Sequence, residues 1–167
     1  MSAYFAFGSN ANTEFLHRWL ESHDVDGEGL SEPQHALLRG FRFRTNYSSV
    51  AHHAGAANIE RSPQDHVEGV LYEITPSVRT ALRQKEGWPR RYEEIEVIVE
   101  VVSSGKTVTA LTYIVAPDRR LDHDLPVSTK YRRLIIDAAE KHRFSPAYQR
   151  FLRQFLKTSH VAVAPQI

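Results

Sequence analysis

The segment from Tyr4 to Asn10 contains the first residues of this sequence whose types and spacing suggest chemistry. Its aromatic part, Tyr4 to Phe7, is typical of a buried strand, and it ends abruptly in Gly8-Ser9-Asn10. Glycine and asparagine tolerate positive φ, and serine and asparagine side chains can brace the backbone, so these residues predict a sharp turn. Such a turn leaves backbone N–H groups pointing outward, as in many sites that hold a carboxylate or a phosphate.

A second candidate is Glu86, in the last turn of the helix that we predict between Pro76 and Gly87. Val78 and Leu82 precede it at intervals of four residues, so the three side chains share one face of the helix. Because the two apolar side chains should point into the core, we expect Glu86 to point toward the interior as well.

Both the burial of Glu86 and its place in the last helical turn would favour its protonated form, because the helix dipole disfavours negative charge there. A carboxyl group in such a position is suited to general acid–base catalysis. The alternative is that Glu86 is exposed and pairs with Arg83 or Arg90, and the spacing alone leaves both interpretations open.

Ser9 suggests a different chemistry, that of a serine hydrolase, because it follows a strand as a nucleophile would. The nucleophile elbow of such enzymes needs glycine two residues before and two residues after the serine. Phe7 and Ala11 stand at these positions, so the pattern disfavours this interpretation.

Histidines suggest a third chemistry, metal binding, since the chain has nine of them. His52, His53 and His66 could be imagined as ligands. However, adjacent histidines on a strand point to opposite sides, and no H-E-x-x-H or comparable spacing is present. We therefore interpret them as surface residues and expect no metal site.

Composition limits the class of protein. The chain has 167 residues, no cysteine and a formal net charge of +1, which suits one domain without disulfides and does not favour a nucleic-acid partner. We expect no membrane partner, because no apolar run is long enough to span a bilayer. The first residues lack the basic region of a signal peptide, and we expect a cytoplasmic protein.

The elements that must position the candidate residues follow from periodicity and turn signals. A hairpin is the clearest of them, because apolar and acidic residues alternate before Ser103-Ser104-Gly105-Lys106. We expect a single α+β domain over residues 1–158 and a flexible tail over 159–167. The expected strands are 4–7, 36–47, 57–61 (ended by Ser62-Pro63), 67–74, 94–101 and 107–115, and the expected helices are 13–22, 76–86, 129–142 and 146–158.

Several short motifs together resemble the γ-glutamylcyclotransferase family. Residues 4–10 are similar to its YFAYGSN signature, and Leu82 to Gly87 resemble its L-x-x-x-E-G helix end. Further likenesses occur in the same order along nearly the whole chain: the strand Gly69-Val70-Leu71-Tyr72, Tyr92 with Ile95-Glu96-Val97, Tyr113, the segment Pro126 to Tyr131, and Pro146-Ala147-Tyr148.

The resemblance implies a small mixed β-barrel or curled sheet flanked by helices. It also implies an enzyme of the amide C–N lyase or acyltransferase class that releases 5-oxoproline from a small γ-glutamyl substrate, without a cofactor, in γ-glutamyl and glutathione metabolism. Glu86 corresponds to the catalytic acid–base glutamate of the family. The residues implied to bind substrate are Tyr4, Phe7, Gly8, Ser9, Asn10, Tyr92 and Tyr131.

Three departures from the family pattern concern specificity. Phe7 replaces the tyrosine of YGSN, Ala11 replaces a frequent leucine, and residues 53–57 only loosely match a G-G-x-A segment. We expect Phe7 to alter the substrate preference. A non-catalytic module that binds a metabolite or a protein remains an alternative, and the leaving amine and the oligomeric state, with a homodimer among the options, stay open.

Overall fold

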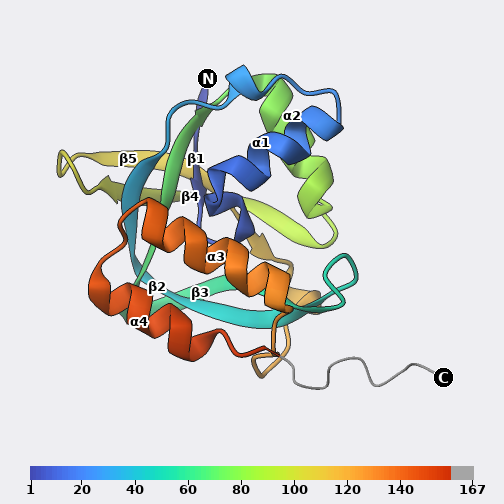
Figure 1. Ribbon diagram of the computed structural model, residues 1–167, viewed down its shortest axis with the longest axis vertical. Coiled ribbons are helices and arrows are strands. Elements are labelled where there is room, and N and C mark those ends of the chain that lie inside the picture. Colours follow the sequence, from blue (N-terminus) through green and yellow to red (C-terminus); the bar gives the residue numbers. More distant parts are fainter. Residues whose placement is uncertain (159–167) are drawn as a thin grey trace.

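Five strands close into a mixed β-barrel in the computed structural model, which describes residues 1–158 (Figure 1). Most neighbouring strands are antiparallel, and a parallel contact between Tyr4 and Leu111 joins the first strand to the last. This closure confirms the barrel that the family resemblance implies. In their order around the barrel the strands are β1 (Ser2–Ala6), β3 (Ala54–Ile74), β2 (Gln34–Ser49), β4 (Tyr92–Val101) and β5 (Thr107–Val115).

Four α-helices flank the barrel within the described residues, α1 and α2 together in the upper part of Figure 1 and α3 and α4 in the lower part. Each begins at a polar N-cap whose side chain accepts a hydrogen bond from a backbone N–H of the first turn. The last helix ends three residues earlier than expected. The helices are α1 (Thr13–Ser22), α2 (Pro76–Glu86), α3 (Thr129–Lys141) and α4 (Pro146–Phe155).

One expectation about the strands is wrong. Instead of two strands separated at Ser62-Pro63, the structure has the single long strand β3. Residues 62–65 stand opposite Gly40 alone in the pairing with β2, because the register shifts at that point. Such a bulge tolerates a proline, which cannot donate a hydrogen bond to the sheet, so the strand continues past Pro63.

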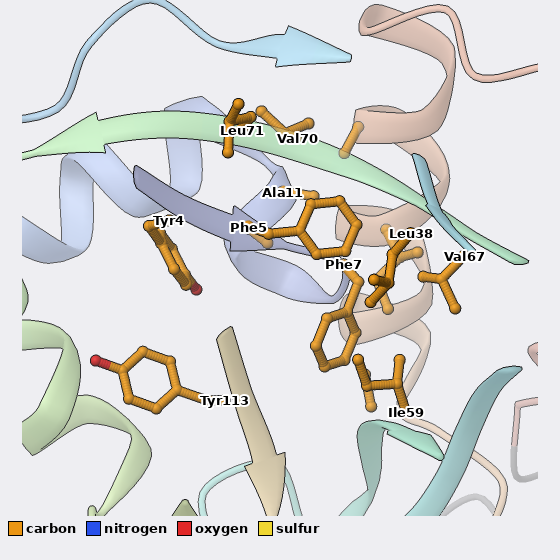
Figure 2. Packing of buried hydrophobic residues seen from close by; sticks show 14 of the residues in the cluster. Tyr4, Phe5, Phe7, Ala11, Leu38, Ile59, Val67, Val70, Leu71 and Tyr113 are labelled. Atoms are coloured by element: carbon orange, nitrogen blue, oxygen red, sulfur yellow. The ribbon is translucent and has the colours of Figure 1, made fainter. Parts of the chain in front are cut away.

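Successive side chains of β1 point to opposite sides of the strand. Figure 2 shows Phe5 pointing to the side of Leu38 and Val67, whereas Tyr4 points toward Tyr113. The Tyr4 and Tyr113 rings are 5.9 Å apart and meet edge to face. One continuous cluster of buried apolar side chains extends through the barrel and the flanking helices.

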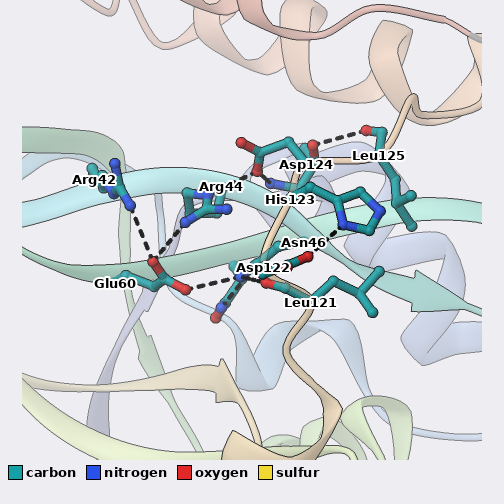
Figure 3. A network of polar contacts seen from close by, with 11 residues as sticks. Arg42, Arg44, Asn46, Glu60, Leu121, Asp122, His123, Asp124 and Leu125 are labelled. Atoms are coloured by element: carbon teal, nitrogen blue, oxygen red, sulfur yellow. Dashed lines mark hydrogen bonds and ion pairs between the residues drawn. The ribbon is translucent and has the colours of Figure 1, made fainter.

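The polar loop over 116–128 is tied to β2 by the network in Figure 3. Asp124 Oδ1 accepts hydrogen bonds from Arg44 Nε, at 2.9 Å, and from the backbone N–H of Thr45, at 2.8 Å. The Leu125 N–H donates to the Thr45 carbonyl at 2.9 Å. Because α3 starts directly after this loop, the network also helps to place Tyr131 in the first turn of α3.

None of the helices in residues 1–158 is long and apolar enough to cross a membrane. The tail expected over 159–167 lies outside the described residues. The single-domain boundary at residue 158 stays a prediction.

Candidate active site

The turn after β1 meets the end of α2 through Asn10. Its side-chain Nδ2 donates to Glu86 Oε1 at 3.0 Å and to the Tyr4 hydroxyl at 2.9 Å. Glu86 lies 76 positions further along the chain, so only the closed barrel brings the two candidates together.

The turn itself is built around a close approach at Gly8. A Cβ added there would lie 3.0 Å from the Ala57 Cβ and 3.3 Å from the Tyr131 hydroxyl oxygen. Glycine therefore lets the chain pass close to β3 and α3. A 3-10 turn from Ser9 to Ala11 follows, and its first backbone N–H groups have no partner inside the turn.

Both ends of α2 have the form that the sequence predicts. Thr75 accepts a hydrogen bond from the Val78 N–H, and Gly87 adopts the left-handed conformation that ends the helix, with φ 68°. Val78 and Leu82 are fully buried, and Glu86 is half-buried on the same face.

The alternative interpretation, in which Glu86 is exposed and pairs with an arginine, finds no support among the described residues, where Glu86 is half-buried. Arg83 binds Glu94 at 2.8 Å and lies over the Trp88 ring at 4.4 Å. Within residues 1–158 Glu86 forms no ion pair with Arg83 or Arg90.

A cavity of about 400 Å³ opens where these elements meet. Every residue that the sequence points to as a site residue lines it: Tyr4, Phe7, Gly8, Ser9, Asn10, Glu86, Tyr92 and Tyr131. The structure therefore gathers them around one space, and the role of each stays a prediction.

Two of the tyrosines are anchored to the same backbone position of β3. The Tyr92 hydroxyl donates to the Ala57 carbonyl at 3.0 Å, and the Ala57 N–H donates to the Tyr131 hydroxyl at 2.9 Å. Burial, followed by the charge of neighbouring groups, raises the pKa of Tyr92 well above its ordinary value, and burial also raises the pKa of Tyr131. Both phenols are therefore neutral and held in fixed positions.

Phe7 lies at the cavity wall with its ring turned partly into the core. The ring centroids of Phe5 and Phe43 are each 6.4 Å from that of Phe7, and only 8% of Phe7 is exposed. Whether Phe7 changes the substrate preference stays a prediction.

Sequence reasoning did not select several residues that line the same cavity. Tyr113 is one of them, and its hydroxyl donates to Glu94 at 2.8 Å. Burial alone would raise the pKa of Glu94, but hydrogen bonds from Arg83, Arg79 and Tyr113 outweigh it and lower the pKa to about 2. Glu94 is thus a permanent anion that orients the Tyr113 ring.

Three other lining residues, Phe15, Trp19 and Lys85, were also not selected, and His52, which lines the cavity too, was considered only as a metal ligand. Phe15 and Trp19 carry a signal, since they are four residues apart on α1, but that spacing equally fits a core-facing stripe. Lys85 precedes Glu86 directly and would be expected on another face of the helix.

Within residues 1–158 neither the serine hydrolase nor the metal site finds the partner residues that it needs. The hydrogen bonds that histidine side chains form within residues 1–158 go to groups other than Ser9. In the same part of the chain no three His, Cys, Asp or Glu side chains group as metal ligands. His53 and His66 are exposed, whereas His52 is half-buried beside the Tyr131 ring, with 4.6 Å between the ring centroids.

Comparison with known proteins identifies the family of the chain. The AIG2-like family matches residues 66–152. Human γ-glutamylcyclotransferase is 30% identical over 151 residues, which are 90% of this chain and 76% of the human protein. The chain belongs to the AIG2-like, or γ-glutamylcyclotransferase, family.

Solved structures place the fold in the γ-glutamylcyclotransferase family as well. A γ-glutamyl cyclotransferase superimposes with a TM-score of 0.81 and 27% identity, covering 96% of this chain and 90% of the other. YkqA from Bacillus subtilis gives a TM-score of 0.77 and 25% identity over 95% of this chain and 56% of its own. This chain is thus homologous to γ-glutamylcyclotransferase enzymes along most of its length.

Proposed function

We propose that the protein is a cyclotransferase that converts a γ-glutamyl amino acid or γ-glutamyl amine to 5-oxoproline and the free amine. The observation that carries this proposal is the hydrogen bond of 3.0 Å between Asn10 and Glu86. It joins the turn and the carboxylate, which the family resemblance assigns to substrate binding and to proton transfer, on one cavity.

The reaction needs no outside nucleophile. The α-amino nitrogen of the substrate attacks its own γ-carbonyl carbon, a five-membered lactam forms, and the C–N bond to the leaving amine breaks. The α-amino nitrogen gives up two protons in all, one from the ammonium group before the attack and one from the attacking nitrogen in the tetrahedral intermediate. One proton is added to the departing nitrogen as the C–N bond breaks, and the free amine takes up the other from solvent.

Glu86 serves both proton steps in this proposal, as base toward the ammonium and then as acid toward the leaving amine. Such general acid–base help is typically worth about 10²- to 10⁴-fold. Asn10 holds the carboxylate in place, because its Nδ2 is fixed between Glu86 and the Tyr4 hydroxyl.

The backbone of residues 8–10 holds the substrate carboxylate or the oxyanion that develops on the γ-carbonyl oxygen. Tyr92 and Tyr131 shape the wall against which the substrate folds back on itself. Holding the amine close to the carbonyl supplies a further part of the rate enhancement.

The direct test is Glu86→Gln, assayed by release of 5-oxoproline from a set of γ-glutamyl amides. We expect turnover to fall by at least about 10²-fold, since the variant loses the group that moves the proton. Glu96→Gln is a matched control, because Glu96 is exposed on β4 and does not line the cavity.

A folded Glu86→Gln variant with near-normal turnover would remove Glu86 from the mechanism. If γ-glutamyl compounds raise the melting temperature of the unaltered protein but release no 5-oxoproline, the protein is a binding module instead. Loss of activity in Ser9→Ala, with full tolerance of Glu86→Gln, would favour the serine hydrolase.

A further inference from the structure

The backbone carbonyl of Asn10 is held by a side chain from outside the cavity. In the turn after β1 the two preceding carbonyls accept hydrogen bonds from the backbone N–H groups of Ala11 and Asn12, at 3.0 Å each. The Asn10 carbonyl accepts from the Tyr72 hydroxyl instead, also at 3.0 Å. Tyr72 is fully buried on β3 and does not line the cavity. Because a buried carbonyl needs such a partner, Tyr72 completes the hydrogen bonding of the turn.

Two more residues extend this contact to the end of α3. Thr13 Oγ1 lies 2.9 Å from the Tyr72 hydroxyl oxygen and 3.2 Å from His142 Nε2. Thr13 is the first residue of α1, and His142 directly follows α3. A chain of three hydrogen bonds therefore links the end of α3, through α1 and β3, to the turn after β1.

A single arrangement of protons satisfies all three contacts. A carbonyl can only accept, so the one hydroxyl proton of Tyr72 goes to Asn10. Thr13 must then donate its own proton to the Tyr72 oxygen, and the proton that Thr13 accepts must come from His142 Nε2. Every bond in the chain therefore points toward Asn10, and bonds aligned in this way strengthen one another.

Burial keeps both ends of this chain in the protonation states that it needs. Burial raises the pKa of Tyr72, so the phenol keeps the proton that it donates. Burial, followed by the charge of Lys141, lowers the pKa of His142. At neutral pH the imidazole is therefore neutral and carries one proton, which the chain of hydrogen bonds requires on Nε2.

The chain ends on the residue that holds Glu86. Tyr72 binds the Asn10 carbonyl, and the side chain of Asn10 donates to Glu86 at 3.0 Å and to the Tyr4 hydroxyl at 2.9 Å. The rings of Tyr4 and Tyr72 also lie nearly parallel, with centroids 6.2 Å apart. Tyr72 thus contacts Asn10 through its hydroxyl and supports, through its ring, the tyrosine that binds the Asn10 side chain.

We infer that Tyr72 is a positioning residue of the active site, and that Thr13 and His142 set the direction of its hydroxyl proton. Tyr72 fixes the backbone of Asn10 and, through the Asn10 side chain, the carboxylate of Glu86. The effect on rate rests on the proposed cyclotransferase function, whereas the proton positions in the chain do not depend on it.

Tyr72→Phe keeps the ring and removes only the hydroxyl. We expect kcat/KM for 5-oxoproline release to fall by about two- to tenfold, the range that corresponds to one hydrogen bond between neutral groups. Tyr148→Phe is the matched control, because Tyr148 is also buried and its hydroxyl forms no hydrogen bond within the described residues. This control should turn over as the unaltered protein does.

A double variant tests whether Tyr72 acts through Asn10. In Asn10→Ala the side chain that holds Glu86 is absent, so adding Tyr72→Phe should lower kcat/KM little further. Two losses that multiply would overturn the inference. So would an unchanged kcat/KM in the folded Tyr72→Phe variant, or an equal loss in Tyr148→Phe.

The direction of the chain can be measured without turnover, because ¹⁵N NMR distinguishes the two neutral forms of histidine. We expect the His142 proton on Nε2 in the unaltered protein and in Thr13→Ser, which keeps the hydroxyl and should keep kcat/KM. Thr13→Val removes the hydroxyl and should lose both this preference and part of kcat/KM. A proton on Nδ1 in the unaltered protein would overturn the assigned direction.

The two proposals fail separately. If no γ-glutamyl compound releases 5-oxoproline, the proposed function and the effect of Tyr72 on rate are both wrong, while the His142 tautomer still decides the direction of the chain. If Glu86→Gln abolishes turnover but Tyr72→Phe does not lower it, the cyclotransferase stands and Tyr72 is not a positioning residue.

Discussion

Asn10 offers the sharpest test of how the site is held together. Its Nδ2 donates to Glu86 at 3.0 Å and to the Tyr4 hydroxyl at 2.9 Å, and the residue is only 5% exposed. In Asn10→Ala the carboxylate loses a buried donor and becomes free to choose another rotamer. The substitution therefore acts on the position of the proton-transfer group rather than on its identity.

The size of the effect follows from the bond that is lost. A hydrogen bond to a charged group contributes about 1.5–3 kcal/mol, and each 1.36 kcal/mol of barrier corresponds to tenfold in rate. We therefore expect kcat/KM for 5-oxoproline release to fall by about 10- to 100-fold. The fall should be smaller than that in Glu86→Gln, because the carboxylate itself remains.

Asn12→Ala is the matched control. Asn12 caps α1 by accepting from the Phe15 N–H at 3.0 Å, and it does not line the cavity. Loss of such a cap costs about 1 kcal/mol, so both variants should lower the melting temperature. If Asn10→Ala loses no more activity than Asn12→Ala at equal folded fraction, Asn10 does not position Glu86.

Two further predictions concern stability and the cavity wall. Burial would raise the pKa of Glu68, but hydrogen bonds from His35, Ser145 and His66 outweigh it and lower the pKa from 4.5 to about 2, which corresponds to about 3 kcal/mol of stability. This contribution is complete above the unfolded pKa and is lost as the pH falls from about 4.5 to 2. In urea unfolding, Glu68→Gln should therefore have a lower free energy of unfolding at pH 7, and that free energy should fall less steeply with acid than in the unaltered protein. An equally steep fall in the variant would contradict this prediction. Phe7→Tyr should lower the free energy of unfolding by about 1–3 kcal/mol where the new hydroxyl is buried unpaired, and an unchanged ratio of rates across γ-glutamyl amides would show that Phe7 does not set the preference.

The sequence was sufficient to predict features that depend on a single helix or strand. The spacing of Val78, Leu82 and Glu86, together with a good cap and Gly87, predicted both α2 and the face that carries the carboxylate. The barrel itself came from the family resemblance, because no local pattern reports the parallel contact that joins β1 to β5. The strand end expected at Ser62-Pro63 is absent because a bulge opposite Gly40 removes the need for the backbone donor that Pro63 lacks.

The cavity residues that the sequence did not predict depend on contacts between segments far apart in the chain. Lys85 becomes part of the cavity only because Phe15 and Trp19 on α1 pack against the end of α2, and this contact joins segments about 70 positions apart. Asn10 was selected for its turn, yet its bond to Glu86 depends on the same long-range packing. Periodicity describes one helix or strand at a time and therefore cannot report contacts of this kind.

The two parts of the site differ in how firmly the fold holds them, and this difference bears on specificity. The turn at residues 8–10 and Glu86 are held by a close backbone approach, a helix cap and the bond from Asn10, so under the proposed function we expect a change there to disturb the proton transfer. Lys85 rests on aromatic faces and Arg91 on the exposed rim, so a change at either alters the charge of the cavity while these constraints stay in place. Under the proposed function we therefore expect recognition of the leaving amine to vary independently of proton transfer, and the ratio of rates for two substrates with different leaving amines measures that recognition more directly than the absolute rate.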